Sequence, residues 1–196
     1  MVFILFIHFS NNASECKVIK AACTKGWYPV SFLLPKNQQQ ATGVAVEIVR
    51  SAAKDLDLAI EFNCLIPWKR ANNYMNTGKI DMLVGHYLNK QREKDWRVSD
   101  TLFEDDIRAV YTKEALEIKT IEDLKYLTGA KPRSASFGTL IDRYISNRSG
   151  DYKVGEVTDK YALFGQLLKG RVDYILSAKK DTEAYSKILG LEDNTS

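Results

Sequence analysis

The chain has 196 residues, of which 45% are hydrophobic and 27% are charged, and its formal net charge is +3. This composition is ordinary for a globular protein, and the length allows one large domain or two small ones with a proper buried core. The charges are interspersed and no basic run exceeds a few residues, so a nucleic-acid-binding surface is not indicated.

The N-terminus resembles an export signal. Residues 1–9 form a short apolar run, MVFILFIHF, and a small, polar stretch follows at 10–14. The run is much shorter than the about 20 residues that a membrane-spanning helix needs. We therefore predict a shortened signal peptide at 1–14 and an exported, periplasmic protein, although the signal lacks a positively charged start. The alternative is a buried first strand.

Three cysteines follow, at Cys16, Cys23 and Cys64, and an odd number leaves one thiol free in an exported chain. Cys16 and Cys23 bracket a predicted strand whose ends lie beyond the reach of a disulfide. Cys23 and Cys64 each end a predicted strand, so they lie at the same edge if those strands are parallel neighbours. A bridge between them and buried free thiols remain the two alternatives, and no spacing resembles a zinc site.

Strands and helices alternate along the first half of the chain, which predicts parallel pairing with right-handed crossovers. The predicted elements are, in order, a strand at 18–22, a loop at 24–40, a helix at 44–56, a strand at 58–64, a helix at 68–77 and a strand at 80–84. The helix at 44–56 is expected to bury the face that carries Val44, Ile48, Val49, Ala52 and Leu56.

The second half repeats this alternation without an internal sequence repeat. Its predicted elements are a strand at 107–112, a capping box at 120–123 before a short helix, a polar strand at 133–136, a helix opened by Gly138 and Thr139, a strand at 154–157, a helix at 160–169 and a strand at 172–177. The two halves are expected to form two α/β lobes connected by extended crossing segments.

Ligands of parallel α/β sheets bind outside the carboxyl ends of the strands. Three segments follow such ends in the first half, at 23–32, 64–70 and 85–92, and all three carry aromatic or cationic side chains. Arg92, in a polar turn beyond the strand at 80–84, is therefore expected at the rim of a ligand site. The alternative for an arginine in such a turn is a surface charge.

Several short motifs follow one another in a fixed order. They are Gly26-Trp27-Tyr28-Pro29, Pro67-Trp68-Lys69-Arg70-Ala71, Gly78-Lys79-Ile80-Asp81, Gln91-Arg92-Glu93-Lys94, Phe137-Gly138-Thr139 and Leu167-Leu168-Lys169-Gly170-Arg171-Val172-Asp173. Their order and spacing resemble the bacterial extracellular solute-binding proteins of family 3, the polar amino-acid-binding components of ABC transporters. The resemblance covers about residues 17–190.

The resemblance implies an α/β fold of the two-lobed, type II periplasmic-binding-protein kind, with parallel sheets flanked by helices and two hinge crossings. It places the first lobe at 15–106, the second lobe at 107–177 and a return to the first lobe at 178–196. Because the chain stops at Ser196, the C-terminal part of the first lobe is expected to be incomplete.

The resemblance also implies a site in the cleft between the lobes. Arg92 matches the arginine that grips the ligand's α-carboxylate, for which a planar guanidinium fork is suited. Gly138 and Thr139 match the helix start that meets the same carboxylate. The other expected cleft residues are Trp27, Tyr28, Trp68, Arg70, Gly85, His86 and Tyr87. As alternatives, the tryptophans cover a sheet end, His86 is a satisfied loop histidine and Arg70 faces solvent.

One departure from the family bears on the ligand. Family members that bind α-amino acids carry an acidic residue just after the strand that here ends at Ser177, and it pairs with the ligand ammonium. Here no carboxylate follows until Asp181. A buried ammonium without a partner is costly. Either Asp181 serves through a shifted register, or the ligand lacks a standard α-ammonium.

The resemblance implies a monomeric periplasmic receptor that closes on a small carboxylate-bearing ligand, an amino acid or a related compound, and delivers it to a membrane ABC permease. No cofactor, metal or nucleic acid is expected. One alternative is a sensory or degenerate ligand-binding domain. Another is an enzyme on the same fold, such as a dehydratase of the cyclohexadienyl type, for which His86, Glu104 and Asp105 are the candidate acids and bases.

Overall fold

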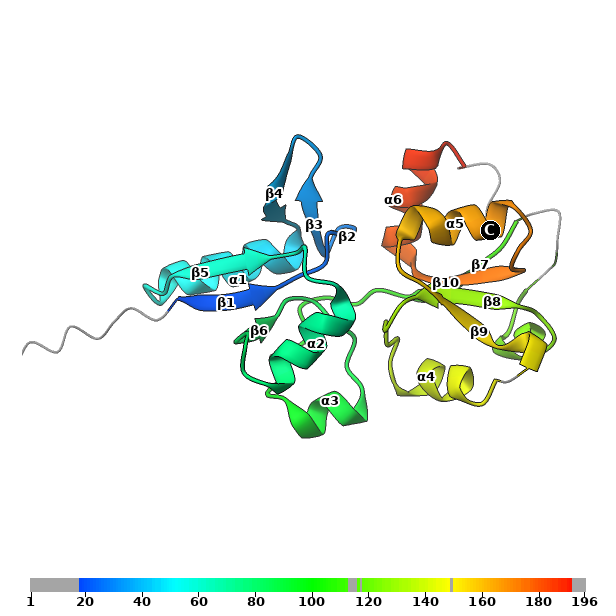
Figure 1. Ribbon diagram of the computed structural model, residues 1–196, viewed down its shortest axis with the longest axis horizontal. Helices are drawn as coiled ribbons and strands as arrows, with labels where there is room; N and C mark the ends of the chain where they lie inside the picture. The colour runs from blue at the N-terminus through cyan, green and yellow to red at the C-terminus, as the bar shows by residue number, and fades with distance from the viewer. Residues whose placement is uncertain (1–17, 113–115, 117, 149, 192–196) are drawn as a thin grey trace, which may run out of the picture.

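The computed structural model describes residues 18–112, 116, 118–148 and 150–191, which form two α/β lobes (Figure 1). The first lobe contains strands β1 to β6 and helices α1 to α3, and the second contains β7 to β10 and α4 to α6. One extended segment after α3 leads from the first lobe into the second (Figure 1). The α/β class is confirmed. The signal peptide expected at 1–14 lies outside the described residues.

The first lobe is built on a three-stranded parallel sheet in the order β5-β1-β6. Its strands are β1 (Ile19–Ala22), β5 (Ile60–Asn63) and β6 (Met82–Leu83). Ala21 of β1 packs in one buried cluster together with residues of α1 (Val44–Asp55), whereas Ala22 packs in another with residues of α2 (Trp68–Asn76). Successive side chains of a strand point to opposite faces, so β1 is buried on both.

Of the face of α1 that was expected to be buried, only Val49 packs against the core. The buried residues of this helix are Ala45, Val46 and Ala53, whereas Ile48 is 41% exposed and Leu56 is 69% exposed. The start of the helix is fixed by tertiary hydrogen bonds from the N–H groups of Val44 and Ala45 to the carbonyls of Pro29 and Val30, at 2.9 and 3.1 Å. These bonds set the rotation of the helix, so small residues face the core.

The segment predicted as a loop at 24–40 contains most of an antiparallel sheet. It comprises β2 (Gly26–Trp27), β3 (Ser31–Leu34) and β4 (Asn37–Thr42), in the order β2-β3-β4. Strand β4 is mostly polar and gave no hydrophobic pattern, so its sequence did not indicate a strand. The Tyr28-Pro29 peptide bond between β2 and β3 is cis.

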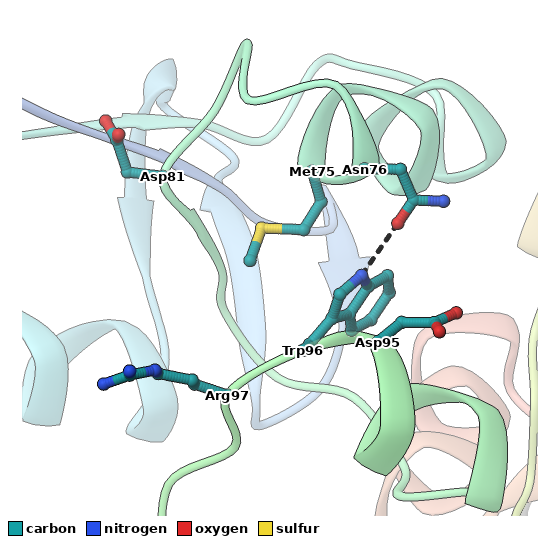
Figure 2. A pocket seen from close by; sticks show the side chains of 6 residues that line it. All are labelled: Met75, Asn76, Asp81, Asp95, Trp96 and Arg97. Carbon is teal, nitrogen blue, oxygen red and sulfur yellow. Dashed lines mark hydrogen bonds between the residues drawn. The ribbon is translucent and has the colours of Figure 1, made fainter.

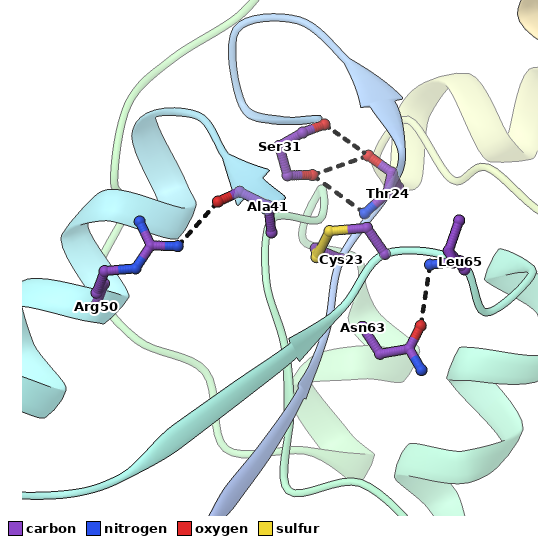
Figure 3. Close-up of a disulfide and its surroundings, with 8 residues drawn as sticks. Cys23, Thr24, Ser31, Ala41, Arg50, Asn63 and Leu65 are labelled. Carbon is purple, nitrogen blue, oxygen red and sulfur yellow. Dashed lines mark hydrogen bonds between the residues drawn. A yellow bond between two sulfur atoms is a disulfide. The ribbon is translucent and has the colours of Figure 1, made fainter. Parts of the chain in front are cut away.

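A disulfide joins Cys23 and Cys64 (Figure 3). The preceding residues, Ala22 and Asn63, are register partners in the parallel pair β1 and β5, so the two cysteines leave the sheet side by side. Their Cα atoms are 4.3 Å apart, and both side chains are buried. Of the two alternatives that the sequence left open, the bridge is therefore confirmed.

The second lobe has a four-stranded sheet in the order β7-β10-β8-β9, with β7 antiparallel to β10. Its strands are β7 (Ile107–Val110), β8 (Gly129–Pro132), β9 (Val154–Val157) and β10 (Tyr174–Ala178). The prediction of a strand at 133–136 was wrong, because the strand in this region, β8, ends at Pro132. A Cβ atom at Gly129 would lie 2.3 Å from the Tyr174 ring, so the start of β8 carries no side chain that could mark it as a strand.

Three helices flank this sheet: α4 (Thr139–Ser146), α5 (Lys160–Leu168) and α6 (Lys179–Leu189). The short 3-10 helices η1 (Ile121–Leu124) and η2 (Gly150–Tyr152) complete the lobe, and the capping box of Thr120 and Asp123 is present. Helix α6 packs against β10 and β7. The described part of the predicted return at 178–196 therefore lies with the second lobe.

Within the described ranges, no helix combines the length and the apolar character that crossing a bilayer requires. The same ranges hold no group of three or more His, Cys, Asp or Glu side chains placed to bind a metal ion.

Candidate ligand-binding site

The loop after β6 passes close to the turn that joins β2 and β3. Gly85 has a φ of +78°, and a Cβ atom there would lie 2.8 Å from the Val30 side chain and 3.4 Å from the Trp27 ring. Glycine is needed here both for the backbone conformation and for the close approach. The loop then reaches α3 (Lys90–Asp95), which the sequence had suggested only as a polar turn.

Arg92 is held inside the protein by α3 and its cap. The Asn89 side chain caps the helix by accepting a hydrogen bond from the Arg92 N–H at 2.9 Å. The side chain of Arg92 is 7% exposed, its Nη1 donates to the Tyr87 carbonyl at 2.6 Å, and its guanidinium lies 5.6 Å from the centre of the Trp96 ring. Arg92 is therefore a buried cation rather than the surface charge that was its alternative.

No carboxylate of the described residues forms an ion pair with Arg92. Burial lowers the pKa of its guanidinium, and the negative charge of Asp142 opposes this shift. Asp142 is not within ion-pair distance of Arg92. A buried charge without a partner is costly, whereas a carboxylate can accept two parallel N–H bonds from a guanidinium. The geometry of Arg92 is therefore suited to an anion.

Tyr87 lies where the two lobes meet. Its ring centre is 5.2 Å from that of Trp27 in the first lobe and 6.0 Å from that of Phe137 in the second. Its hydroxyl is buried and has no hydrogen-bond partner among the described residues. Burial, followed by the charges of Asp105 and Asp181, raises the pKa of Tyr87. The backbone carbonyl of Tyr87 thus contacts the Arg92 guanidinium, and its ring lies on the side of two carboxylates, Asp105 and Asp181, here called the acidic group.

Asp181 is the carboxylate of that acidic group that contacts both lobes. It lies in the first turn of α6, it is fully buried, and its Oδ1 accepts a hydrogen bond from the Tyr28 N–H at 2.9 Å. Its Oδ2 forms an ion pair with the ammonium of Lys160, the first residue of α5. Burial raises the pKa of Asp181, and Lys160 and the Tyr28 N–H oppose that shift. Asp181 therefore joins the first lobe to the second.

A second polar link between the lobes surrounds the start of α4. The Asn89 Nδ2 donates to the Ser136 hydroxyl at 2.7 Å, and this hydroxyl donates to Asp142 at 2.5 Å. Gly138, with a φ of +91°, is the N-cap of α4, and no side chain caps this helix. The first N–H groups of α4, at Gly138 and Thr139, therefore lie next to the loop that carries Arg92, where they could bind an anion.

Two of the predicted site residues lie apart from this group. Trp68 begins α2 and packs in the cluster that contains Ala71 and Ile80, and Arg70 is exposed on the same helix. Tyr28, by contrast, contacts the rings of Phe32 and Tyr185 and so lies on the side of Asp181.

His86 lies near Arg92 and beside Trp96. Its ring meets that of Trp96 edge-on at 5.8 Å, and its Nε2 is buried without a hydrogen-bond partner among the described residues. Burial and the charge of Arg92 lower the pKa of His86 to about 4. His86 is therefore a neutral ring at neutral pH.

The pocket in Figure 2 is a different feature. It lies beside β6 and contains none of the predicted site residues, and the Trp96 Nε1 donates to Asn76 across it at 2.7 Å. Its lining residues are Met75, Asn76, Asp81, Asp95, Trp96 and Arg97. A second hollow, beside β5, also lacks them. We place the candidate site where the chemistry converges, between the lobes, because neither hollow contains a buried charge.

Sequence reasoning missed the role of Lys160 and the link between Asn89 and Ser136. Lys160 is 21 residues from Asp181, and Asn89 is 47 residues from Ser136. Nothing in the local sequence distinguishes these side chains from solvated polar residues. The one available signal was the N-cap position of Asn89, three residues before Arg92.

Two α/β lobes that bring a buried cation, a buried carboxylate and several aromatic rings together where they meet are suited to bind a small polar ligand between them. The model of the family described as bacterial extracellular solute-binding proteins, family 3, matches residues 19–190. The chain belongs to this family.

Known proteins of similar sequence and structure agree with this membership. The probable amino-acid-binding protein YxeM of Bacillus subtilis (strain 168) is 22% identical over 185 residues, which cover 93% of this chain and 67% of that protein. An ancestral arginine-binding protein bound to arginine has a TM-score of 0.77 at 21% identity, covering 91% of this chain and 77% of that one. The substrate-binding protein of an amino acid ABC transporter has a TM-score of 0.75 at 19% identity, covering 92% and 77%.

Proposed function

We propose that this protein is an exported receptor that captures a small, polar, carboxylate-bearing ligand between its lobes and delivers it to a membrane ABC permease. Family membership and the likeness to an ABC-transporter component support the transport role. Buried Arg92, which forms no ion pair with any described residue, is the observation that carries the ligand class.

In this proposal Arg92 and the start of α4, at Gly138 and Thr139, hold the ligand carboxylate from opposite lobes. A ligand that both lobes bind favours their closed arrangement, because its contacts are complete only in that state. The aromatic and loop residues around this point, which enclose the rest of the ligand, are Trp27, Tyr28, Gly85, His86 and Tyr87. Trp68 and Arg70 are not part of the proposed site.

The test is a thermal-shift screen of the mature protein against α-amino acids, other small carboxylates and amines. A ligand at 100 times its dissociation constant adds about 2.7 kcal/mol to the free energy of unfolding, which is a clear shift. The affinity of the best ligand is then measured by calorimetry for the wild type and for Arg92→Ala. We expect the variant to bind at least about tenfold more weakly, because a hydrogen bond to a charged group contributes about 1.5–3 kcal/mol.

Arg97→Ala is the matched control. Arg97 is an exposed arginine a short distance along the same segment, so its removal should leave the affinity unchanged. Equal affinities of Arg92→Ala and the wild type would contradict the proposed role of Arg92. A folded protein that no carboxylate stabilises would contradict the proposed function.

A further inference from the structure

Two charged side chains are buried where the lobes meet, and they differ in one respect. Arg92 forms no ion pair with a carboxylate of the described residues, whereas Asp181 already has a cation, the ammonium of Lys160. An α-amino acid carries one anionic and one cationic group. The protein therefore offers an open partner for the first group and an occupied partner for the second.

Both oxygens of Asp181 are in use. Its Oδ1 accepts from the Tyr28 N–H and its Oδ2 pairs with Lys160. The backbone at Lys160 is held at the start of α5, because Asp159 caps this helix by accepting from the Ala162 N–H at 3.1 Å. The Lys160 ammonium also lies 5.8 Å from the centre of the Tyr185 ring, which attracts a cation.

A ligand ammonium would have to displace this one to reach Asp181. The lysine is part of the chain, so its local concentration is high and it loses no translational freedom on pairing. A free amino acid loses that freedom on binding. An uncharged group at the same place on the ligand meets no such competition.

We propose that Lys160 acts as a built-in ammonium that determines ligand class, so that the site takes a small carboxylate without an α-ammonium in preference to an α-amino acid. This inference rests on the proposed function of the Arg92 site. Asp105 is the other carboxylate of the acidic group, and its Oδ2 is buried without a hydrogen-bond partner among the described residues. A ligand ammonium bound by Asp105 is therefore the competing outcome of the test.

The first experiment tests the ammonium position without any ligand. In Lys160→Ala the side chain is removed from a position that is 20% exposed, while Asp181 stays buried. Methylammonium chloride should raise the melting temperature of this variant by several degrees, relative to sodium chloride at equal ionic strength. It should not do so for the wild type or for the double variant Lys160→Ala/Asp181→Asn.

Equal responses of all three proteins would overturn the assignment of Lys160. If Lys160→Ala does not fold, Lys160→Met preserves most of the side-chain volume and takes its place. The double variant Lys160→Met/Asp181→Asn carries no buried charge at this point and serves as its folded control.

The second experiment compares matched ligands that differ only in the α-ammonium. L-glutamine is paired with glutaric acid monoamide and L-arginine with 5-guanidinopentanoate, and further α-amino acids are paired with their des-amino analogues. The affinities are measured for the wild type and for Lys160→Ala. We expect the wild type to bind the des-amino member of a pair at least about tenfold more tightly, and the variant to gain affinity for the amino acid.

The outcomes separate the two proposals. A wild type that binds an α-amino acid as tightly as its des-amino analogue, with loss of binding in Arg92→Ala, overturns the role of Lys160 and keeps the proposed function. Loss of that binding in Asp105→Asn would then identify Asp105 as the ammonium partner. If no carboxylate binds any variant while methylammonium still stabilises Lys160→Ala, the proposed function fails, and the ligand-class inference fails with it.

Discussion

The two lobes treat their buried charges differently. The first lobe contributes Arg92, whose guanidinium is buried with a carbonyl and an aromatic ring as neighbours. The second lobe contributes Asp181, which is buried with a lysine as its partner. A paired buried charge belongs to the structure of the protein, whereas an unpaired one indicates a partner that arrives from outside. Three predictions test this difference and a fourth tests the disulfide of the first lobe, in order from the largest expected effect to the smallest.

The largest effect is expected for the paired charge. Lys160→Ala leaves Asp181 buried without a cation, so the free energy of unfolding should fall by about 3–5 kcal/mol. Equilibrium urea unfolding measures the loss. The double variant Lys160→Met/Asp181→Asn should recover most of it, because both charges are gone. A loss below about 1 kcal/mol in the single variant would show that the pair is not what keeps Asp181 buried.

The disulfide gives the first lobe a covalent link that the described part of the second lobe lacks. Cys23 and Cys64 are separated by 41 residues, and closing a loop of this length restricts the unfolded chain. Replacing both cysteines by alanine should lower the free energy of unfolding by about 2–4 kcal/mol. Urea unfolding of the variant and of the reduced wild type should give similar values. If the oxidised wild type has the same free energy of unfolding as the variant, the disulfide does not stabilise the fold.

Burial of His86, together with the charge of Arg92, should make the protein sensitive to acid. The pKa of His86 is lowered to about 4, so between pH 6.5 and 4 the unfolded chain takes up a proton that the folded chain does not. This contribution to stability is complete above pH 6.5 and is lost as the pH falls toward 4. Its slope is at most about 1.4 kcal/mol per pH unit, and less because the ring is only partly buried.

His86→Gln should flatten this dependence when urea unfolding is repeated between pH 4 and 7. The carboxylates that titrate in the same range are common to both proteins, so the difference between the two curves isolates His86. Parallel curves would mean that the folded protein protonates His86 as readily as the unfolded chain does.

The smallest effect is expected for the unpaired charge itself. Arg92→Met keeps the aliphatic packing and removes a buried cation that no described carboxylate neutralises. Without ligand, the free energy of unfolding should change by less than about 1 kcal/mol, close to the contribution of the one hydrogen bond to the Tyr87 carbonyl. Urea unfolding in ligand-free buffer tests this. A loss as large as that of Lys160→Ala would assign Arg92 a structural role and remove the contrast.

The sequence by itself determined the alternation of strands and helices, because these patterns depend on neighbours a few residues apart. Strand β9 and helices α4 and α5 begin where the sequence placed them. The motifs also identified the family, which the comparison with the family model confirmed.

Only the tertiary structure decided the buried face of α1, the three-stranded sheet formed by β2, β3 and β4, and the partner of Asp181. The face of α1 depends on hydrogen bonds to Pro29 and Val30, which no helical pattern encodes. Lys160 and Asp181 lie in the first turns of two different helices, and they meet because both helices pack on β10. A charge pattern along the chain gives the sign of each side chain, but the lobe packing decides which charges are buried and which of them are paired.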